Sequence, residues 1–431
     1  MKLLNTFCGE ENKWKIPFGL VWGSQTISIF GSMLVQFALV WWITQTTGSA
    51  TRLTTAMVFQ YLPSIFLGPF IGALVDRWNR KKVMIYADAL VALATLGLAA
   101  LYWAGLMQLW HVYAILFIRS LGGTFQWPAM QASISMMVPP RHLARVSGIN
   151  QAIRGALNIA APPLGALLLA WLPMYGVISV DVLTASLAIP LMIFATIPQP
   201  SRESSNTSLT FSNLAGDVKE GVRFVLQWKG LRNMIFIAII LNVLSNPAFS
   251  LMPILVTDHY SGDVWQFSLM ESLFGVGVII GGSAMGIWGG FKRKINSAVL
   301  GLALFGLGTS IIGITPPAGF YIGLVGIFIT GLANPVINAA FFAIIQSKVN
   351  PDKQGRLFSL IDSLILAFSP VSLLLSGPLA EKYGVPIWFL ILGLFTIVAA
   401  IGTLFNRDLV QIEEYQNPVH VKTALEPGNS G

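Results

Sequence analysis

Six ionisable residues lie inside apolar stretches of this chain, where a charge is costly. They are four acids and two arginines: Asp88, Asp181, Glu271, Asp362, Arg119 and Arg154. Charged side chains within a bilayer normally face a cavity or a partner, and they often mark paths for protons or substrates. A carboxylate whose arginine partner comes and goes changes its affinity for a proton, because a nearby opposite charge favours the ionised form. These residue types predict proton-linked chemistry; permanent structural ion pairs are the alternative.

Two pairs of asparagines form a second set of polar residues inside apolar stretches. Asn242 and Asn246 are four residues apart, as are Asn334 and Asn338, so each pair lies on one face of a helix. Asn246 and Asn334 each precede a proline, and irregular backbone at membrane depth is tolerated where it lines a cavity. These side chains are candidate substrate contacts. The alternative is hydrogen bonding between helices, worth about 0.6 kcal/mol per pair.

The apolar stretches that carry these residues are long enough to cross a bilayer. The chain has 431 residues, of which 55% are hydrophobic and 10% are charged, whereas a soluble domain typically has about 25% charged residues. Runs of about 20 apolar residues span a hydrocarbon core of about 30 Å. The runs cover 17–43, 53–75, 83–105, 110–137, 146–172, 174–197, 231–256, 265–289, 296–315, 319–347, 356–380 and 385–406. The sequence therefore predicts an all-α membrane protein with twelve transmembrane helices.

The net charge of +8 follows the expected topology rather than a nucleic-acid partner. With alternating spans and a cytoplasmic N-terminus, only Arg52 and Lys382 fall on the outer side, and Arg119 and Arg154 fall within spans. The remaining Lys and Arg lie on the cytoplasmic side, which is the positive-inside pattern. The distribution predicts that both termini are cytoplasmic and that the chain binds no nucleic acid.

The chain divides into two halves that repeat each other's motifs. Gly68-x-x-x-Gly72 recurs as Gly282-x-x-x-Gly286, and Pro140-x-x-x-x-Arg145 recurs as Pro351-x-x-x-x-Arg356, at similar offsets. Two parallel six-span halves are a known transporter plan, with the substrate site near the bilayer midplane between them. The expected domains are a six-helix half, a cytoplasmic linker with a short amphipathic helix, a second six-helix half and a disordered tail, at 1–197, 198–230, 231–406 and 407–431.

The loop after the second apolar run carries a dense motif, Gly72-Ala-Leu-Val-Asp76-Arg77-Trp-Asn-Arg80-Lys-Lys. It resembles the signature loop of the major facilitator superfamily, Gly-x-x-x-Asp-Arg-x-x-Arg-Lys/Arg. Gly72 allows close helix approach, and Asp76 can accept hydrogen bonds from Arg77 and Arg80 or lie at a helix N-terminus. Such a clasp would hold the cytoplasmic side shut and break when that side opens. The alternative is a positive-inside loop with an incidental acid.

Further motifs resemble one branch of that superfamily. Arg119-Ser-Leu-Gly-Gly123 looks like the Arg-x-x-x-Gly element of proton-coupled exporters. Ala161-Pro-Pro-Leu-Gly-Ala166 is similar to the antiporter element Gly-Pro-x-x-Gly-Gly, with alanine in place of its first and last glycine. Over nearly its whole length the chain most resembles the bacterial macrolide-efflux branch, through phrases such as Thr47-Gly-Ser-Ala50 and Gly355-Arg-Leu-Phe-Ser-Leu360.

This resemblance implies the expected function and the roles of the site residues. It implies a monomeric, proton-driven exporter of amphipathic, macrolide-like small molecules in a bacterial inner membrane. It places Arg119, Arg154, Glu271 and Asp362 in proton coupling, and Arg154 and Glu271 are expected to pair in one facing state. A permanent pair that fixes helix register is the alternative. The resemblance places Asp88 and Asp181 on supporting helices, where a structural role is expected and proton coupling is the alternative. The candidate substrate contacts are Gln25, Asn242, Asn246, Asn334 and Asn338.

Other functions fit the sequence less well. A siderophore or metabolite exporter, or a proton-coupled importer, would share the fold and differ in substrate or direction. No convergent nucleophile and base, no metal-ligand cluster and no phosphate-binding Gly-Lys-Ser/Thr element occur in the sequence, although enzymes and ATP-driven pumps need such groups. The expectation is a transporter that is not an enzyme and uses no cofactor, metal or ATP.

Overall fold

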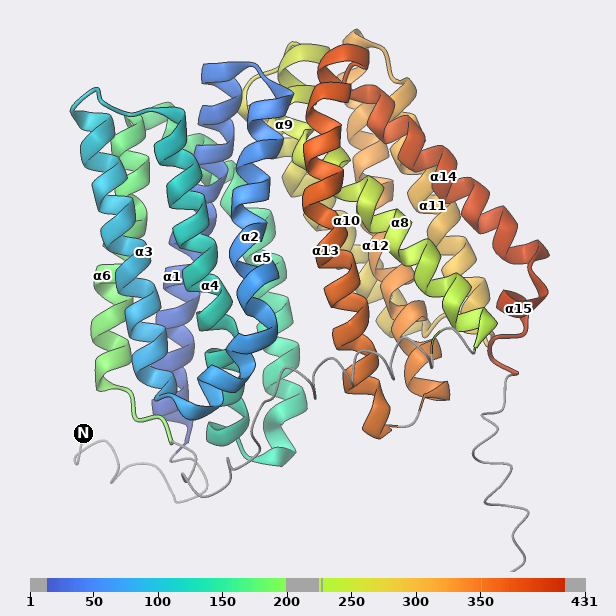
Figure 1. Ribbon diagram of the computed structural model, residues 1–431, viewed down its shortest axis with the longest axis horizontal. Helices are drawn as coiled ribbons and strands as arrows, with labels where there is room; N and C mark the ends of the chain where they lie inside the picture. The colour runs from blue at the N-terminus through green and yellow to red at the C-terminus, as the bar shows by residue number, and fades with distance from the viewer. Residues whose placement is uncertain (1–13, 199–224, 226–227, 350, 415–431) are drawn as a thin grey trace, which may run out of the picture. The chain divides into compact units, whose positions relative to one another are not determined.

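The computed structural model describes residues 14–198, 225, 228–349 and 351–414, and this part of the chain is helical without a strand (Figure 1). Ten of its helices are long and apolar enough to cross a membrane. The expectation of an all-helical membrane protein is thus confirmed. The long helices are α1 (Lys15–Thr47), α2 (Ala50–Arg77), α3 (Arg80–Trp103), α4 (Leu109–Met137), α5 (Pro140–Trp171), α6 (Met174–Phe194), α8 (Lys229–Ser250), α10 (Val264–Trp288), α11 (Lys294–Ile314), α12 (Phe320–Lys348), α13 (Pro351–Tyr383) and α14 (Pro386–Phe405).

Local signals in the sequence set several helix ends. Ser49 precedes α2, and its side chain accepts a hydrogen bond from the Arg52 N–H; Asn79 does the same for α3 through the Lys82 N–H. Such caps satisfy N–H groups that have no partner within the helix. Gly48 ends α1 in the left-handed conformation, with φ of 55°, which glycine adopts without a steric penalty.

The apolar run at 231–256 is not one continuous helix. Helix α8 ends at Ser250, and a short helix α9 (Met252–Ile254) and a π-helical turn η4 (Leu255–His259) follow it. Pro253 lies in this junction and has no N–H to continue the hydrogen bonding of α8. The prediction of a single helix over this run is therefore wrong at its C-terminal end.

Part of the expected linker and tail also folds. The start of the tail forms α15 (Arg407–Val410), and Leu409 and Ile412 are buried, so residues 407–414 depart from the expected disorder. The Ile295 N–H donates to a Glu413 carboxylate oxygen at 2.8 Å. Residues 199–224, 226–227 and 415–431, which include the expected amphipathic helix, lie outside the described part of the chain.

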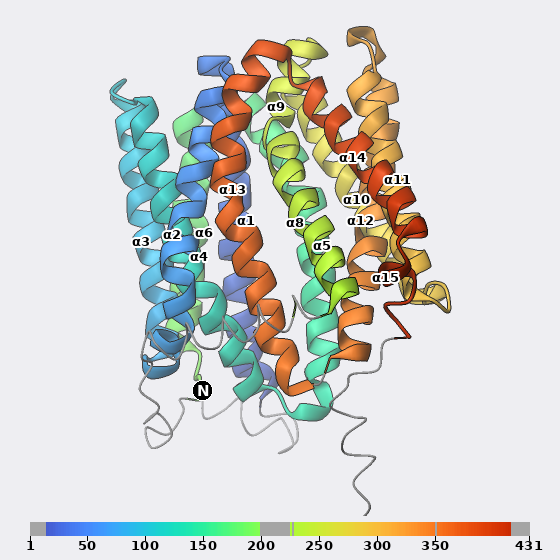
Figure 2. The ribbon, with the colours of Figure 1, turned by 45° about the vertical axis from the view of Figure 1, so that its right-hand side comes forward.

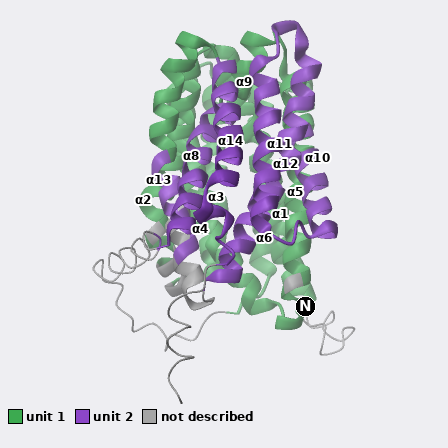
Figure 3. Ribbon diagram, turned by 90° about the vertical axis from the view of Figure 1, so that its right-hand side faces the viewer, with its two compact units in different colours: residues 1–209, 250–272, 369–384 green, residues 210–249, 273–368, 385–431 purple. Residues whose placement is uncertain are grey.

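The chain forms two compact units (Figure 3). Unit 1 comprises residues 1–209, 250–272 and 369–384, and unit 2 comprises residues 210–249, 273–368 and 385–431. Each unit has its own apolar core.

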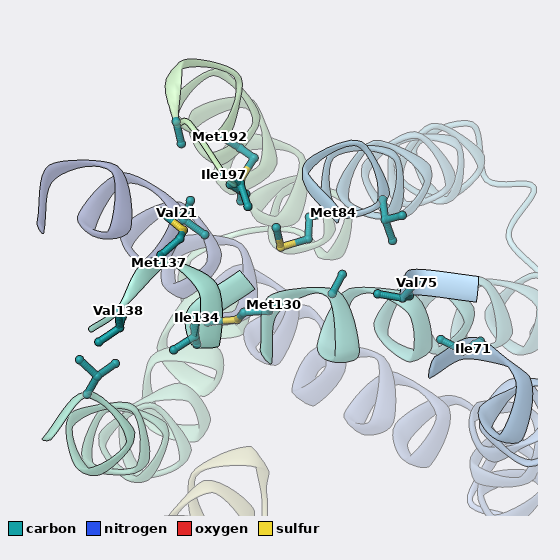
Figure 4. Close-up of a cluster of buried hydrophobic side chains, with 14 residues drawn as sticks. Val21, Ile71, Val75, Met84, Met130, Ile134, Met137, Val138, Met192 and Ile197 are labelled. Atoms are coloured by element: carbon teal, nitrogen blue, oxygen red, sulfur yellow. The ribbon is translucent and has the colours of Figure 1, made fainter. Parts of the chain in front are cut away.

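In unit 1, α1 packs against α5 and α6, α3 packs against α4 and α6, and α2 packs against α4 (Figures 1 and 2). Apolar side chains from α1, α2, α3, α4 and α6 gather into one cluster (Figure 4), which includes Val21, Val75, Met84, Met130 and Met192.

Two segments from later in the chain also belong to unit 1. The Phe267 ring stacks on Phe37 and Trp41 of α1, with ring centroids 5.0 and 5.9 Å apart. The Glu381 carboxylate accepts hydrogen bonds from the Ser49 hydroxyl at 2.5 Å and the Thr51 N–H at 3.1 Å. Aromatic stacking thus attaches residues 250–272, and a capping contact at the start of α2 attaches residues 369–384.

In unit 2, glycines allow helices to approach closely. Helix α11 packs against α12 and α14. A Cβ atom added to Gly308 of α11 would lie 2.6 Å from the Gly326 carbonyl oxygen of α12. A Cβ atom on Gly277 of α10 would lie 2.6 Å from the Phe328 carbonyl oxygen. These backbones touch where no side chain intervenes, which is typical of small-residue packing between membrane helices.

Candidate functional site

Arg119 and Asp181 form a buried ion pair within unit 1. Arg119 lies on α4 and Asp181 on α6, and the side chains are 8% and 4% exposed. The other guanidinium nitrogen of Arg119 donates to the Ser32 carbonyl oxygen at 2.8 Å. The Ser32 hydroxyl donates to Asp181 at 2.9 Å, and the Thr95 hydroxyl donates to Asp181 at 3.1 Å. We call Ser32, Thr95, Arg119 and Asp181 the Asp181 layer.

Asp88 is the centre of a second buried polar cluster in unit 1. Its Oδ1 accepts hydrogen bonds from the Ser28 hydroxyl at 2.6 Å and the Gln126 amide at 2.8 Å. Its Oδ2 accepts a hydrogen bond from the Gln25 amide at 3.0 Å. The Gln126 amide also donates to Gln25 Oε1 at 2.7 Å. Gln25, Ser28, Asp88 and Gln126 form the Asp88 layer, in which every described donor to the carboxylate is neutral.

The two layers use the same helices at positions seven residues apart. Helix α3 supplies Asp88 to one layer and Thr95 to the other, and α4 supplies Gln126 and Arg119. Seven residues are about two turns of an α-helix, or about 10 Å along its axis. Unit 1 therefore holds two polar layers about 10 Å apart, one with balanced charges and one built around a single carboxylate.

Arg154, on α5, lies over an aromatic ring. Its guanidinium carbon is 3.8 Å from the centroid of the Trp127 ring on α4, a cation–π arrangement. One turn earlier on α5, Asn150 accepts a hydrogen bond from the Trp22 indole N–H. The expected pair with Glu271 does not form in this structure, where Arg154 faces Trp127.

Glu271 is half-buried on α10, and within the described residues its carboxylate has no hydrogen-bond or ion-pair partner. The next residue, Ser272, donates to the Ile159 carbonyl oxygen of α5 at 3.1 Å. Ile159 follows Arg154 by five residues, about 7.5 Å along the helix. Glu271 therefore adjoins the segment of α5 that carries Arg154. The side chain of Asp362 lies outside the described part of the structure.

The clasp residues lie at the end of α2 and the start of α3. The side chains of Asp76 and Arg77 and the surroundings of Gly72 are outside the described part of the structure. Arg80 is buried, and its guanidinium donates to the Ala132 carbonyl oxygen of α4 at 3.3 Å.

Three of the predicted asparagines in unit 2 bond within their own helices. The Asn242 amide donates to the Ala238 carbonyl oxygen at 2.9 Å. The Asn338 amide donates to the carbonyl and side-chain oxygens of Asn334, at 3.0 and 3.1 Å. Asn338 is exposed, and Asn246 is half-buried.

The Asp88 layer contains residues for which the sequence predicted a different role or no role. Gln25 was predicted as a substrate contact, yet it is fully buried and bonded to Asp88. The Asp88 layer also contains Ser28 and Gln126, which carried no prediction. One signal was available: Gln25, Ser28 and Ser32 follow the i, i+3, i+7 spacing of a single helical stripe, and all three contribute to the layers.

Comparisons with known proteins agree with this fold. A family profile described as transmembrane secretion effector, within the major facilitator superfamily, matches residues 15–422. Macrolide efflux protein A of Streptococcus pyogenes is 32% identical over 394 residues, which cover 91% of this chain and 96% of that protein. The multidrug efflux pump Tap of Mycobacterium tuberculosis is 26% identical over 392 residues, covering 89% and 92%.

A solved structure shares the fold at low sequence identity. A mutant form of the nucleoside transporter NupG superposes with a TM-score of 0.66 at 12% identity, covering 90% of this chain and 98% of that one. The match of the profile over almost the whole chain, together with the identity to efflux proteins, establishes the family. The chain belongs to the transmembrane secretion effector family of the major facilitator superfamily, and it is an integral membrane transporter of small molecules.

Proposed function

We propose that the chain exports amphipathic small molecules of the macrolide kind in exchange for protons, by alternating access in a bacterial inner membrane. The observation that carries this proposal is the 32% identity to macrolide efflux protein A over 91% of the chain. The buried ionisable groups of unit 1 support the proton-coupled part, because such groups within a membrane are characteristic of proton relays.

The proposal includes twelve spanning helices in two six-helix bundles with cytoplasmic termini. Helices α2 and α4 are not among the ten that qualify by length and hydropathy. They have 28 and 29 residues, however, about 42 Å of helix. Helix α4 also carries Arg119 and Gln126, which bond inside unit 1, so these two polar side chains face protein. We therefore assign α2 and α4 as two further spans.

Proton exchange is assigned to Glu271 and Arg154. Glu271 lacks a described partner, and it adjoins the segment of α5 that carries Arg154. In the other facing state Arg154 leaves Trp127 and pairs with Glu271, which releases its proton because the nearby cation favours the carboxylate. When the pair breaks, Glu271 takes up a proton again. Asp362 is the next candidate for this role.

The clasp of Gly72, Asp76, Arg77 and Arg80 is assigned to the cytoplasmic side. Replacing Asp76 with Asn should unbalance the two facing states and lower transport while the protein stays in the membrane. Transport at the wild-type rate in Asp76→Asn would remove the clasp from the mechanism. A matched control is Asp408→Asn, an exposed acid near the end of the described chain.

Everted membrane vesicles test the function directly. The vesicles are energised to acid inside, and a macrolide such as erythromycin, an iron-free siderophore or a cationic dye is added while the internal pH is followed. Export in exchange for protons predicts proton release from the vesicles on adding the macrolide. Release with the siderophore alone would change the substrate class, and no release with any compound would contradict the proposal.

The coupling acid is tested in the same vesicles. Glu271→Gln should abolish uptake driven by the pH gradient but leave macrolide binding to purified protein intact. The matched control is Asp258→Asn, an exposed acid in η4, which should behave as wild type. Accumulation of macrolide against a gradient by Glu271→Gln would place the coupling acid elsewhere.

A further inference from the structure

The Asp88 layer differs from the Asp181 layer in how its charge is balanced. Asp181 has Arg119 as its cation. Asp88 is 4% exposed, and its described partners are two amides and a hydroxyl. An ionised carboxylate that is buried without a cation is expensive, whereas a protonated one is a neutral hydrogen-bonding group.

Charged groups on the helices around Asp88 do not provide that cation. Helices α4 and α6 carry Arg119 and Asp181, which pair with each other. The remaining basic and acidic residues whose side chains are described on α1 to α5 lie near helix ends or on α5, outside the hydrogen-bonding shell of Asp88: Lys15, Arg52, Arg80, Lys81, Lys82, His111, Arg141, His142, Arg145 and Arg154. Asp76 and Arg77 lie in the last turn of α2.

The hydrogen bonds of the layer suit both protonation states. When Asp88 is ionised, the Ser28 hydroxyl donates to Oδ1 at 2.6 Å. When a proton occupies Oδ1, the carboxyl O–H donates to Ser28 Oγ across the same distance, because a hydroxyl is both donor and acceptor and its hydrogen rotates. The Gln126 and Gln25 amides keep donating to Oδ1 and Oδ2 in either state. One hydroxyl therefore reverses direction, and no other group of the layer has to move.

From this geometry we infer that Asp88 is a proton-binding site in unit 1, with Gln25, Ser28 and Gln126 as its permanent hydrogen-bond shell. This inference rests on the proposed proton-coupled function and adds a second titrating carboxyl to Glu271. The step is simple proton transfer: a proton from water binds Oδ1, and the carboxylate charge is neutralised.

Because Ser28 lies on α1 and Asp88 lies on α3, protonation reverses a hydrogen bond between these two helices. Helix α1 also carries Phe37 and Trp41, which stack on Phe267 of α10. A proton on Asp88 therefore changes a hydrogen bond of α1, and α1 is the helix on which residues 250–272, including Glu271, pack. Asp88 is a proton carrier that communicates with the rest of unit 1 through α1.

Infrared difference spectroscopy of the purified full-length protein, between alkaline and acidic pH and without substrate, tests the site. Wild-type protein should gain the C=O stretch of a buried carboxylic acid on acidification. Asp88→Asn should lose that component, and Glu271→Gln should keep it. An Asp88→Asn spectrum identical to that of wild type would overturn the inference.

A second pair of variants keeps the test decisive if Asp88→Asn does not fold. Ser28→Ala leaves the carboxyl in place but removes one hydrogen bond, so it should shift the frequency of the same C=O band. The matched control is Ser24→Ala, one turn away on α1, where the hydroxyl is buried and donates to the Val21 carbonyl oxygen at 2.8 Å. The control should leave the band unchanged. An unshifted band in Ser28→Ala would contradict the assignment to Asp88.

Two further measurements separate this inference from other outcomes. The titration is repeated in NaCl and in KCl; the carboxylic acid band should appear on acidification in both salts, and its absence in NaCl alone would assign the layer to Na⁺ and overturn proton binding as its role. The vesicle assay reports on transport independently. A protein that shows the Asp88 band but no drug-linked proton release would contradict the proposed function and leave the proton site standing. Drug-linked proton release by a protein that lacks the Asp88 band would contradict the proton site and leave the proposed function standing.

Discussion

Buried side chains that bond to two aspartates join helices in unit 1, whereas close glycine contacts join helices in unit 2. Unit 1 also has close glycine contacts, at Gly31 and Gly377, in addition to its polar bonds. In unit 1, Asp88 and Asp181 collect hydrogen bonds from α1, α3 and α4. In unit 2, buried hydroxyls such as those of Thr309 and Thr330 bond to carbonyls of their own helices. The repeated sequence motifs predict similar halves, but the interior chemistry differs.

The two units thus illustrate two ways in which membrane helices pack: through glycines and through buried polar side chains. Glycine packing depends on shape, and it tolerates no added atom where backbones touch. Buried polar packing depends on charge and hydrogen bonding, and it is sensitive to any change that leaves a charge without a partner. Only the second kind of packing can respond to a proton. The proton-binding roles that we propose for Asp88 and Glu271 therefore draw on the polar packing of unit 1.

The largest expected effect comes from breaking the ion pair of unit 1. Arg119→Met leaves Asp181 buried without its cation, and removal of one partner of a buried pair typically costs about 3–5 kcal/mol. The variant should show a strongly lowered thermal unfolding midpoint in detergent and reduced recovery as a monodisperse species. Methionine keeps most of the apolar stem, so the loss reports on charge rather than volume.

A double variant distinguishes charge from packing at this site. Arg119→Met combined with Asp181→Asn removes both charges and leaves an amide that still bonds to Ser32 and Thr95. Most of the lost stability should return. If the double variant is as unstable as Arg119→Met alone, the Asp181 layer is held by packing, and the contrast between the two units fails.

A single methyl group tests the glycine packing of unit 2. A Cβ atom on Gly281 of α10 would overlap the Leu332 carbonyl oxygen of α12, whereas a Cβ atom on Gly282 has its nearest neighbour, the Pro335 Cβ, at 3.9 Å. Gly281→Ala should cost about 3 kcal/mol, the upper end for overpacking, because a backbone carbonyl moves less easily than a side chain. Gly282→Ala is the matched control and should unfold at the wild-type temperature. Equal midpoints for the two would show that α10 and α12 adjust freely.

Much of the fold follows from the sequence because long apolar runs can satisfy their backbone in lipid only as helices. The interruption after α8 was harder to predict, because the apolar run continues across Pro253 and masks the end of the helix. Helices α10 and α12 approach closely at Gly277 and Gly281, as is typical of small-residue packing between membrane helices.

The polar layers could be predicted only in part. A structural ion pair was one of two alternatives for Arg119, but its partner could not be named, because that requires knowing which faces of α4 and α6 meet. The Asp88 layer was missed for the same reason. Its members come from α1, α3 and α4, and glutamine and serine in a membrane helix carry no distinctive signal when each is considered alone.

The smallest expected effect comes from a pair of isosteric substitutions that compares the two units directly. Thr95 in unit 1 and Thr330 in unit 2 are both fully buried, and Thr→Val replaces each hydroxyl with a methyl of similar size. The Thr95 hydroxyl donates to Asp181 at 3.1 Å and accepts from Arg119 at 3.3 Å. Thr95→Val should therefore cost about 1.5 kcal/mol, as for a hydrogen bond to a charged group. The Thr330 hydroxyl donates to the Gly326 carbonyl oxygen at 2.8 Å, an oxygen of its own helix, so Thr330→Val should cost about 0.5 kcal/mol, the low end for a neutral bond. Thermal unfolding of both variants in the same detergent measures the difference. Equal midpoints would mean that the Thr95 hydroxyl does not stabilise the ion pair of Arg119 and Asp181. The hydrogen bond between helices in unit 1 would then contribute no more stability than the hydrogen bond within one helix in unit 2.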